Sequence, residues 1–121
     1  MMTERNVHFI ASLNQVYCIK SHFSERIIDL IDNPSFSLVG RELTNLVAQT
    51  DLELYHLDQI FYCLNERLSF SNLKALIESL DTLYDNVTDV INVPQLGHIG
   101  LFDYLSQLKN KKSLLWFHYI A

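Results

Sequence analysis

Two pairs of histidine and glutamate have the spacing that metal ligands take on a helix. Glu53 precedes His56 by three residues, and His22 precedes Glu25 by the same interval. This spacing brings a carboxylate and an imidazole onto adjacent turns, and di-iron sites in helical bundles use it when other helices add further carboxylates. Glu53 would lie at the edge of the apolar stripe of its helix, and the other three residues would lie off it. We therefore expect a boundary glutamate and surface histidines here, with Glu53 and His56 as weak metal candidates.

An acidic row and a glycine pair are the other polar features. Asp81, Asp85 and Asp89 repeat every four residues, so they share one edge of a helix, which is either a solvated face or a surface for a divalent ion or a basic partner. Gly97 and Gly100 flank His98, and each glycine inside a helix costs roughly 1 kcal/mol against alanine. The glycines therefore indicate a close helix approach, a kink or lost side chains. The sequence holds no Ser/His/Asp set and no phosphate-binding glycine loop, so we do not expect an enzyme.

The strongest helical signal covers residues 35–67. Its apolar positions recur at spacings of three, four and seven and fall on one stripe. They are Val39, Leu43, Leu46, Thr50, Leu57, Phe61 and Leu64. A helix of roughly 30 residues is about 45 Å long and cannot bury such a stripe alone. We predict that this segment is the central strut of an antiparallel bundle.

Three more helices are expected around this strut. The first covers residues 4–32, and Asn33 and Pro34 separate it from the second, because proline cannot continue a helix but suits the first position of the next. The third spans residues 73–91, with Ser69 or Ser71 as its cap, and the fourth runs over residues 94–108. The predicted fold is all-α: an antiparallel four-helix bundle in a single domain, residues 1–121, with a short C-terminal helix or tail.

The composition argues against nucleic-acid and membrane partners. The net charge is −5 and no basic patch accompanies the aromatic residues, so nucleic acid is not an expected partner. There is no run of about 18 apolar residues and no apolar segment near the start, so we expect no membrane association and a cytoplasmic location. Cys18 and Cys63 lack metal-ligand spacing and are expected to be buried free thiols.

The end of the sequence is unusually apolar. After three lysines it reads SLLWFHYIA. It forms either a short fifth helix on the end of the bundle or a tail that another subunit covers. We expect a homodimer that covers it. The residues expected at this interface are Leu114, Leu115, Trp116, Phe117, Tyr119 and Ile120.

Four segments carry a family resemblance. Residues 50–61 read TDLELYHLDQIF, and weaker echoes lie at residues 13–17, 73–76 and 97–105. Together they resemble motifs of the ferritin-like stress proteins of the YciE/YciF type. The resemblance implies a ferritin-like four-helix bundle, usually dimeric, with a di-metal centre between the helices and a role in stress.

Most metal-ligand positions implied by this resemblance hold other residues. The glutamate of the first helix falls on Lys20, and only His98 matches. The other positions fall on Ala48, Gln49, Asp51, Ile77, Gly97 and Gly100. One imidazole cannot hold two cations whose charge carboxylates would neutralise, so the resemblance implies a scaffold without its metal and without a cofactor.

Three functional hypotheses follow. The leading one is a non-enzymatic, metal-free bundle that acts through self-association or through a second protein. The first alternative is a divergent di-iron or di-manganese protein of oxidative or metal stress that uses His98, Asp51 and Glu53. The second is an inhibitor or adaptor whose acidic row binds a basic protein.

Lys20 interrupts the apolar stripe of the first helix. Its stem could lie along the seam while the ammonium reaches solvent. We predict instead that the ammonium is partly buried in a polar core and bonded to Glu53 or Asp51, or to the hydroxyl of Tyr17 or Thr50.

Overall fold

The computed structural model describes residues 4–90 and 99–108, and all regular structure within these ranges is helical. The long helices are α1 (Glu4–Ile31), α2 (Gly40–Cys63) and α3 (Lys74–Asp89), and the short 3₁₀ helix η1 (Pro34–Val39) joins the first two. A fourth α-helix covers residues 99–108. The prediction of an all-helical chain with four helices is therefore confirmed. No helix in these ranges is long and apolar enough to cross a membrane.

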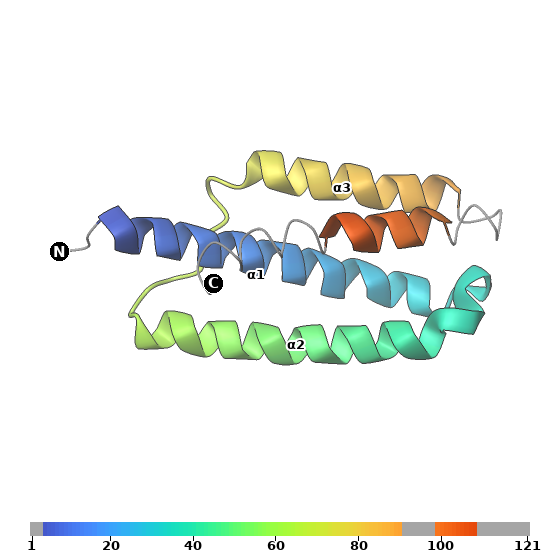
Figure 1. Cartoon of the computed structure of the whole chain (residues 1–121), viewed down its shortest axis with the longest axis horizontal. Coiled ribbons are helices and arrows are strands. Elements are labelled where there is room, and N and C mark those ends of the chain that lie inside the picture. Colours follow the sequence, from blue (N-terminus) through green and yellow to red (C-terminus); the bar gives the residue numbers. More distant parts are fainter. Residues whose placement is uncertain (1–3, 91–98, 109–121) are drawn as a thin grey trace.

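The central helix is α1. It packs against both α2 and α3, whereas the backbones of α2 and α3 do not closely approach each other in the described part of the chain. Figure 1 shows α2 on one side of α1 and α3 with helix 99–108 on the other, and successive helices run in opposite directions. The prediction that residues 35–67 form the central strut is therefore wrong. The helix that precedes them takes that place because it is apolar on two sides.

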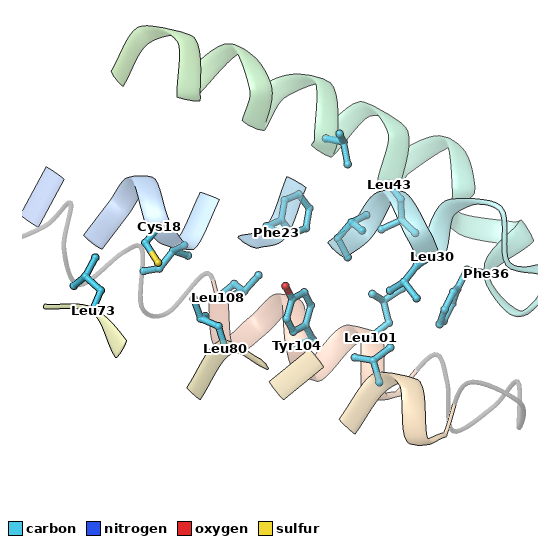
Figure 2. Packing of buried hydrophobic residues seen from close by; sticks show 14 residues of the cluster. Cys18, Phe23, Leu30, Phe36, Leu43, Leu73, Leu80, Leu101, Tyr104 and Leu108 are labelled. Atoms are coloured by element: carbon cyan, nitrogen blue, oxygen red, sulfur yellow. The ribbon is translucent and has the colours of Figure 1, made fainter. Parts of the chain in front are cut away.

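Two hydrophobic clusters follow one another along α1. The smaller one joins α1 to α2 through Leu13, Val16, Leu57 and Phe61. The larger one gathers residues from all four helices and η1 (Figure 2). Its members include Cys18, Ile19, Phe23, Ile27, Leu30, Phe36, Leu43, Leu80, Val87, Leu101 and Tyr104. Consequently α1 is buried on two faces and α2 on one.

The predicted helix over residues 35–67 is interrupted. Phe36 has φ −115° and ψ 18°, which is not helical, and this conformation lets its ring enter the core with 0% exposure. The side chain of Asn33 caps the turn by accepting a 2.9 Å hydrogen bond from the Ser35 amide. At the other end α2 stops at Cys63, and Asn65 adopts φ 55°, a conformation that commonly terminates helices. Burial of Phe36 thus overrides the helical periodicity.

The connection between α2 and α3 is held by α1. Asn14 accepts a 2.7 Å hydrogen bond from the Ser69 amide, so this loop is tied to the central helix. The N-cap of α3 is Leu73, which makes no side-chain capping bond, and the predicted serine cap is wrong.

Gly100 marks a close approach between helix 99–108 and α3. A Cβ at this position would lie 3.1 Å from Val90 Cγ2 and 3.5 Å from the Asn86 carbonyl oxygen. Of the three readings that the sequence left open for the glycines, close approach therefore applies to Gly100. Gly97, His98 and the predicted helix start at residue 94 lie outside the described residues.

Candidate functional site

A buried ion pair joins α1 to α2. Lys20 is only 3% exposed, and its Nζ donates a 2.9 Å hydrogen bond to Glu53 Oε1. The Glu53 side chain is 31% exposed, so water reaches the carboxylate but hardly reaches the ammonium. Of the partners that the sequence left open for Lys20, the structure selects Glu53. The position implied for a metal-ligating glutamate therefore holds a positive charge with its own counter-ion.

The other residues of the predicted polar core are Asp51, Thr50 and Tyr17, and they lie along the same contact between α1 and α2. Asp51 accepts a 2.5 Å hydrogen bond from Ser24 Oγ, and Thr50 is buried beside it in α2. Tyr17 is half-buried, and its ring packs edge-on against Phe61 with centroids 6.2 Å apart. Burial, followed by the hydrogen bond and charge of Asp58, raises the pKa of Tyr17. This seam between α1 and α2 is therefore polar at several points along an otherwise apolar contact.

A second polar cluster lies on the opposite side of α1 and was not predicted. His22 Nδ1 lies 2.9 Å from the Tyr104 hydroxyl, and His22 Nε2 lies 3.0 Å from Asp81 Oδ1. His22 is 8% exposed and Tyr104 is 0% exposed, so the cluster is enclosed. In Figure 2 the Tyr104 hydroxyl points from helix 99–108 toward α1. One histidine therefore links α1, α3 and helix 99–108.

The charge state of this cluster follows from its burial. Desolvation lowers the pKa of His22, with the Asp81 carboxylate acting in the opposite sense, so the ring is neutral at pH 7. The tautomer that satisfies both neighbours donates Nε2–H to Asp81 and accepts the Tyr104 hydroxyl proton at Nδ1. Desolvation also raises the pKa of Tyr104 well above its usual range, so the hydroxyl keeps its proton. The chain of bonds runs from the fully enclosed Tyr104 to the half-buried Asp81 and links three helices through the core.

Arg26 closes the solvent side of the cluster. Its Nη2 lies 3.4 Å from Asp81 Oδ1, and its guanidinium carbon is 5.9 Å from the centre of the Tyr84 ring. Asp81 is therefore half-buried and engaged by α1, while Asp85 and Asp89 remain exposed. The predicted acidic row thus divides into one structural residue and two solvent-facing ones.

The predicted surface pair of His22 and Glu25 is wrong. His22 is buried and bonded to other helices, whereas Glu25 is exposed and accepts a 3.4 Å hydrogen bond from Ser21 Oγ. The signal in the sequence was a second apolar row on the same helix: Cys18 and Ile19 flank His22 and lie outside the first stripe, which consists of Phe9, Leu13, Val16, Phe23, Ile27 and Leu30. A helix with two apolar rows is typical of a central position, where a histidine must find partners.

The metal candidates are not gathered into a site. Glu53 is bonded to Lys20, Asp51 accepts a bond from Ser24, and His56 is exposed on α2. Within residues 4–90 and 99–108 no three His, Cys, Asp or Glu side chains are grouped so that they could hold a metal ion. His98 lies outside the described residues.

The cysteines differ from each other. Both are free, but Cys18 is buried and Cys63 is exposed at the end of α2, so the prediction of two buried thiols is wrong for Cys63. Burial raises the pKa of the Cys18 thiol, and nearby Asp81 and Glu25 add to the effect. The predicted interface residues of the apolar C-terminal segment, 114–117, 119 and 120, lie outside the described residues.

Comparisons with known proteins do not assign this chain to a family. No protein-family model, curated protein or solved structure matches this chain.

Proposed function

We propose that this chain is a metal-free, non-enzymatic helical bundle that works by association, with a second copy of itself as its first partner. The observation that carries this proposal is the outer face of α2. α2 packs chiefly against α1, and the described side chains on the opposite side of α2 are exposed. That side carries Leu52, Tyr55 and Tyr62, which are 55%, 56% and 86% exposed.

Exposed apolar side chains gathered on one helix face are typical of interaction surfaces. Single exposed apolar residues are ordinary in soluble proteins, but these three share a helix and lie opposite its buried side. Tyrosine is also enriched at interfaces, because it offers a large apolar ring and a hydroxyl that can remain hydrated. Association would remove this face from water without rearranging the core.

The ion pair of Lys20 and Glu53 supports the metal-free part of the proposal. A divalent cation placed between α1 and α2 at this level would meet a buried ammonium, and their repulsion would be weakly screened. Glu53 already neutralises that ammonium. A di-metal centre would therefore need Lys20 to leave or to lose its proton.

The ferritin-like part of the resemblance has weaker support. Ferritin-like folds contain one long crossover connection between helices. Here residues 64–73 join α2 to α3, and α3 starts toward the end of the molecule at which α2 stops (Figure 1). We therefore propose the bundle and its outer face as the working parts, and a role in stress rests on the resemblance alone.

Light scattering coupled to gel filtration tests the association. At micromolar concentration we expect a mass of twice the 14.1 kDa of one chain. Metal analysis of the same peak tests the second half of the proposal, and we expect no stoichiometric iron or manganese. A monomer at every concentration would overturn self-association, and a di-metal complement in each chain would overturn the metal-free assignment.

A further inference from the structure

The contact between α1 and α2 has two edges, which differ in how they are covered. At 100° per residue, Asp51 and Asp58 lie on one edge of α2, where they bond to Ser24 and Tyr17 of α1. The connection from α2 to α3 passes over this edge, since Phe70 packs against the Tyr17 ring with centroids 6.3 Å apart. This edge of the contact is therefore closed by the chain that follows α2.

The opposite edge of α2 carries an apolar row that is only partly buried. Glu53, Leu57, Ile60 and Leu64 share this edge, because they follow one another at spacings of four, three and four residues. Leu64 is the C-cap of α2, and its amide still bonds to the Ile60 carbonyl oxygen at 3.0 Å. Leu57 is buried, but Ile60 and Leu64 are 38% and 43% exposed. Two large apolar side chains at this end of α2 are therefore partly in water.

Helix 99–108 lies on the side of the molecule that this edge faces. On α1, Ile19 and Phe23 lie on the edge away from Tyr17, and both belong to the same buried cluster as Leu108 (Figure 2). Tyr17 is bonded to Asp58, so the edge of α1 away from Tyr17 meets the edge of α2 away from Asp58. Helix 99–108 therefore follows the same edge of the contact as the apolar row of α2.

The fourth helix, as far as it is described, ends level with the middle of α1. His22 and Tyr104 are bonded at 2.9 Å and their helices run in opposite directions (Figure 1), so Leu108 comes level with Cys18. Residues 4–17 of α1 extend about 21 Å beyond that level. Residues 109–121, which lie outside the described residues, would span about 20 Å as a helix. The chain after Leu108 therefore has the length needed to reach the start of α1.

We propose that residues 109–121 continue the fourth helix along this edge and cover Ile60 and Leu64 of their own chain. Leu115 follows Leu108 by seven residues, as Leu108 follows Leu101, so the continued helix would present all three on its buried face. The outer face of α2 would remain free for association, so this docking does not rest on the proposed function.

Two bonds set the levels of the helices along the bundle. The α2 helix and the fourth helix both run opposite to α1 (Figure 1). Lys20 is bonded to Glu53 and His22 to Tyr104, which places residue 106 of the fourth helix level with Glu53. Nine residues farther along both helices, residue 115 comes level with residue 62. The docked leucine at position 115 would therefore lie within one turn of both partly exposed side chains of α2.

The charges near the start of this segment also suit the docking. Lys109, Lys111 and Lys112 follow Leu108, and the 31% exposed Glu53 carboxylate lies on the same edge, within about two turns of their level. Lysine stems can lie along an apolar surface while their ammonium groups reach water or a carboxylate. The basic stretch would thus pass beside a negative charge before the apolar residues meet α2.

Trp116 can report on this docking, because it is the single tryptophan of the chain. In the folded protein we expect its emission to be shifted to the blue of the urea-unfolded chain and its quenching by acrylamide to be several-fold weaker. Both should stay unchanged on dilution to concentrations at which gel filtration gives a monomer, because the chain itself supplies the site. Emission equal to that of the unfolded chain, or a red shift on dilution as a second copy dissociates, would refute the proposal.

Matched glutamate substitutions locate the docking site. Ile60→Glu puts a carboxylate on the proposed edge and should shift the Trp116 emission most of the way to that of the unfolded chain. Leu52→Glu, on the outer face of α2, should leave the emission unchanged. Circular dichroism would verify that each variant is folded, and Leu64→Glu takes the place of Ile60→Glu if the latter does not fold. Equal emission from the edge variant and the outer-face variant would overturn the docking site. A wild type that stays monomeric with blue-shifted emission would overturn the proposed function and leave the docking in place.

Discussion

The Lys20 ammonium on α1 and the Glu53 carboxylate on α2 form a 2.9 Å ion pair in which the lysine side chain is 2% exposed and the glutamate side chain 31%. Removing an ammonium from water is costly, and its carboxylate partner offsets that cost only while both are present. The two residues are therefore unequal in their effect on stability, since one can be replaced by an apolar side chain of similar shape and the other cannot.

Replacing Lys20 or Glu53 should therefore change the free energy of unfolding by different amounts. Lys20→Met fills the same space without a charge and should change the free energy of unfolding by less than about 1 kcal/mol, or increase it. Glu53→Ala takes the carboxylate from a buried ammonium and should cost about 2 kcal/mol or more, below the range for fully buried pairs because water reaches Glu53. Urea unfolding followed by circular dichroism measures both. In the double variant Lys20→Met with Glu53→Ala, most of the loss should disappear. Equal losses in the two single variants would contradict the account.

Stability should fall in acid because of His22. Burial holds its pKa below the ordinary 6.5 in the folded chain, so between these two pKa values the unfolded chain binds a proton that the folded chain does not. Above pH 6.5 the titration of His22 therefore does not change the free energy of unfolding. As the pH falls from 6.5 toward the lower pKa of the folded chain, the free energy of unfolding decreases by at most about 1.4 kcal/mol per pH unit. Urea unfolding at pH 7.5, 6.5 and 5.5 should show a smaller loss for His22→Gln than for the wild type.

His56 provides the matched control for this experiment. It is exposed on α2, so His56→Gln should keep the wild-type dependence on pH. If His22→Gln and the wild type lost the same stability between pH 7.5 and 5.5, His22 would not be the titrating group.

Two glycines should respond oppositely to a side chain. At Gly100 a Cβ would already meet Val90 Cγ2 at 3.1 Å, so Gly100→Leu should force helix 99–108 from α3 and cost about 2 kcal/mol or more. At Gly40 a Cβ would meet just one atom of the described residues, the Ile31 carbonyl oxygen at 3.7 Å, and the backbone is helical, so Gly40→Ala should stabilise by up to about 1 kcal/mol. Urea midpoints of both variants give the comparison. A Gly100→Leu variant as stable as the wild type would contradict the close approach.

Much of the fold could be predicted because helical spacing is a local property. The boundary at Asn33 and Pro34 was predicted from proline geometry, and Asn33 does cap the following turn. The burial of Lys20 also followed from its place within an apolar stripe. Each of these conclusions depends on residues within one or two turns.

The remaining features depend on contacts between distant residues. Phe36 leaves the helical pattern because a space in the core receives its ring, and His22 is buried because Asp81 and Tyr104 come from helices 59 and 82 residues away. The second apolar row of α1, with Cys18 and Ile19, could have shown which helix is central.

The central place of α1 also affects how the chain is made. Because α1 precedes its partners in the sequence, it leaves the ribosome before the helices that cover its two apolar faces. The hairpin with α2 can form early, but the side carrying Ile19, His22 and Leu30 waits for α3 and helix 99–108. At 5–20 residues per second, the 45 residues from 64 to 108 that follow this hairpin take roughly 2–9 s to synthesise. During those seconds the nascent hairpin presents one uncovered apolar face, which is the kind of surface that chaperones protect from aggregation.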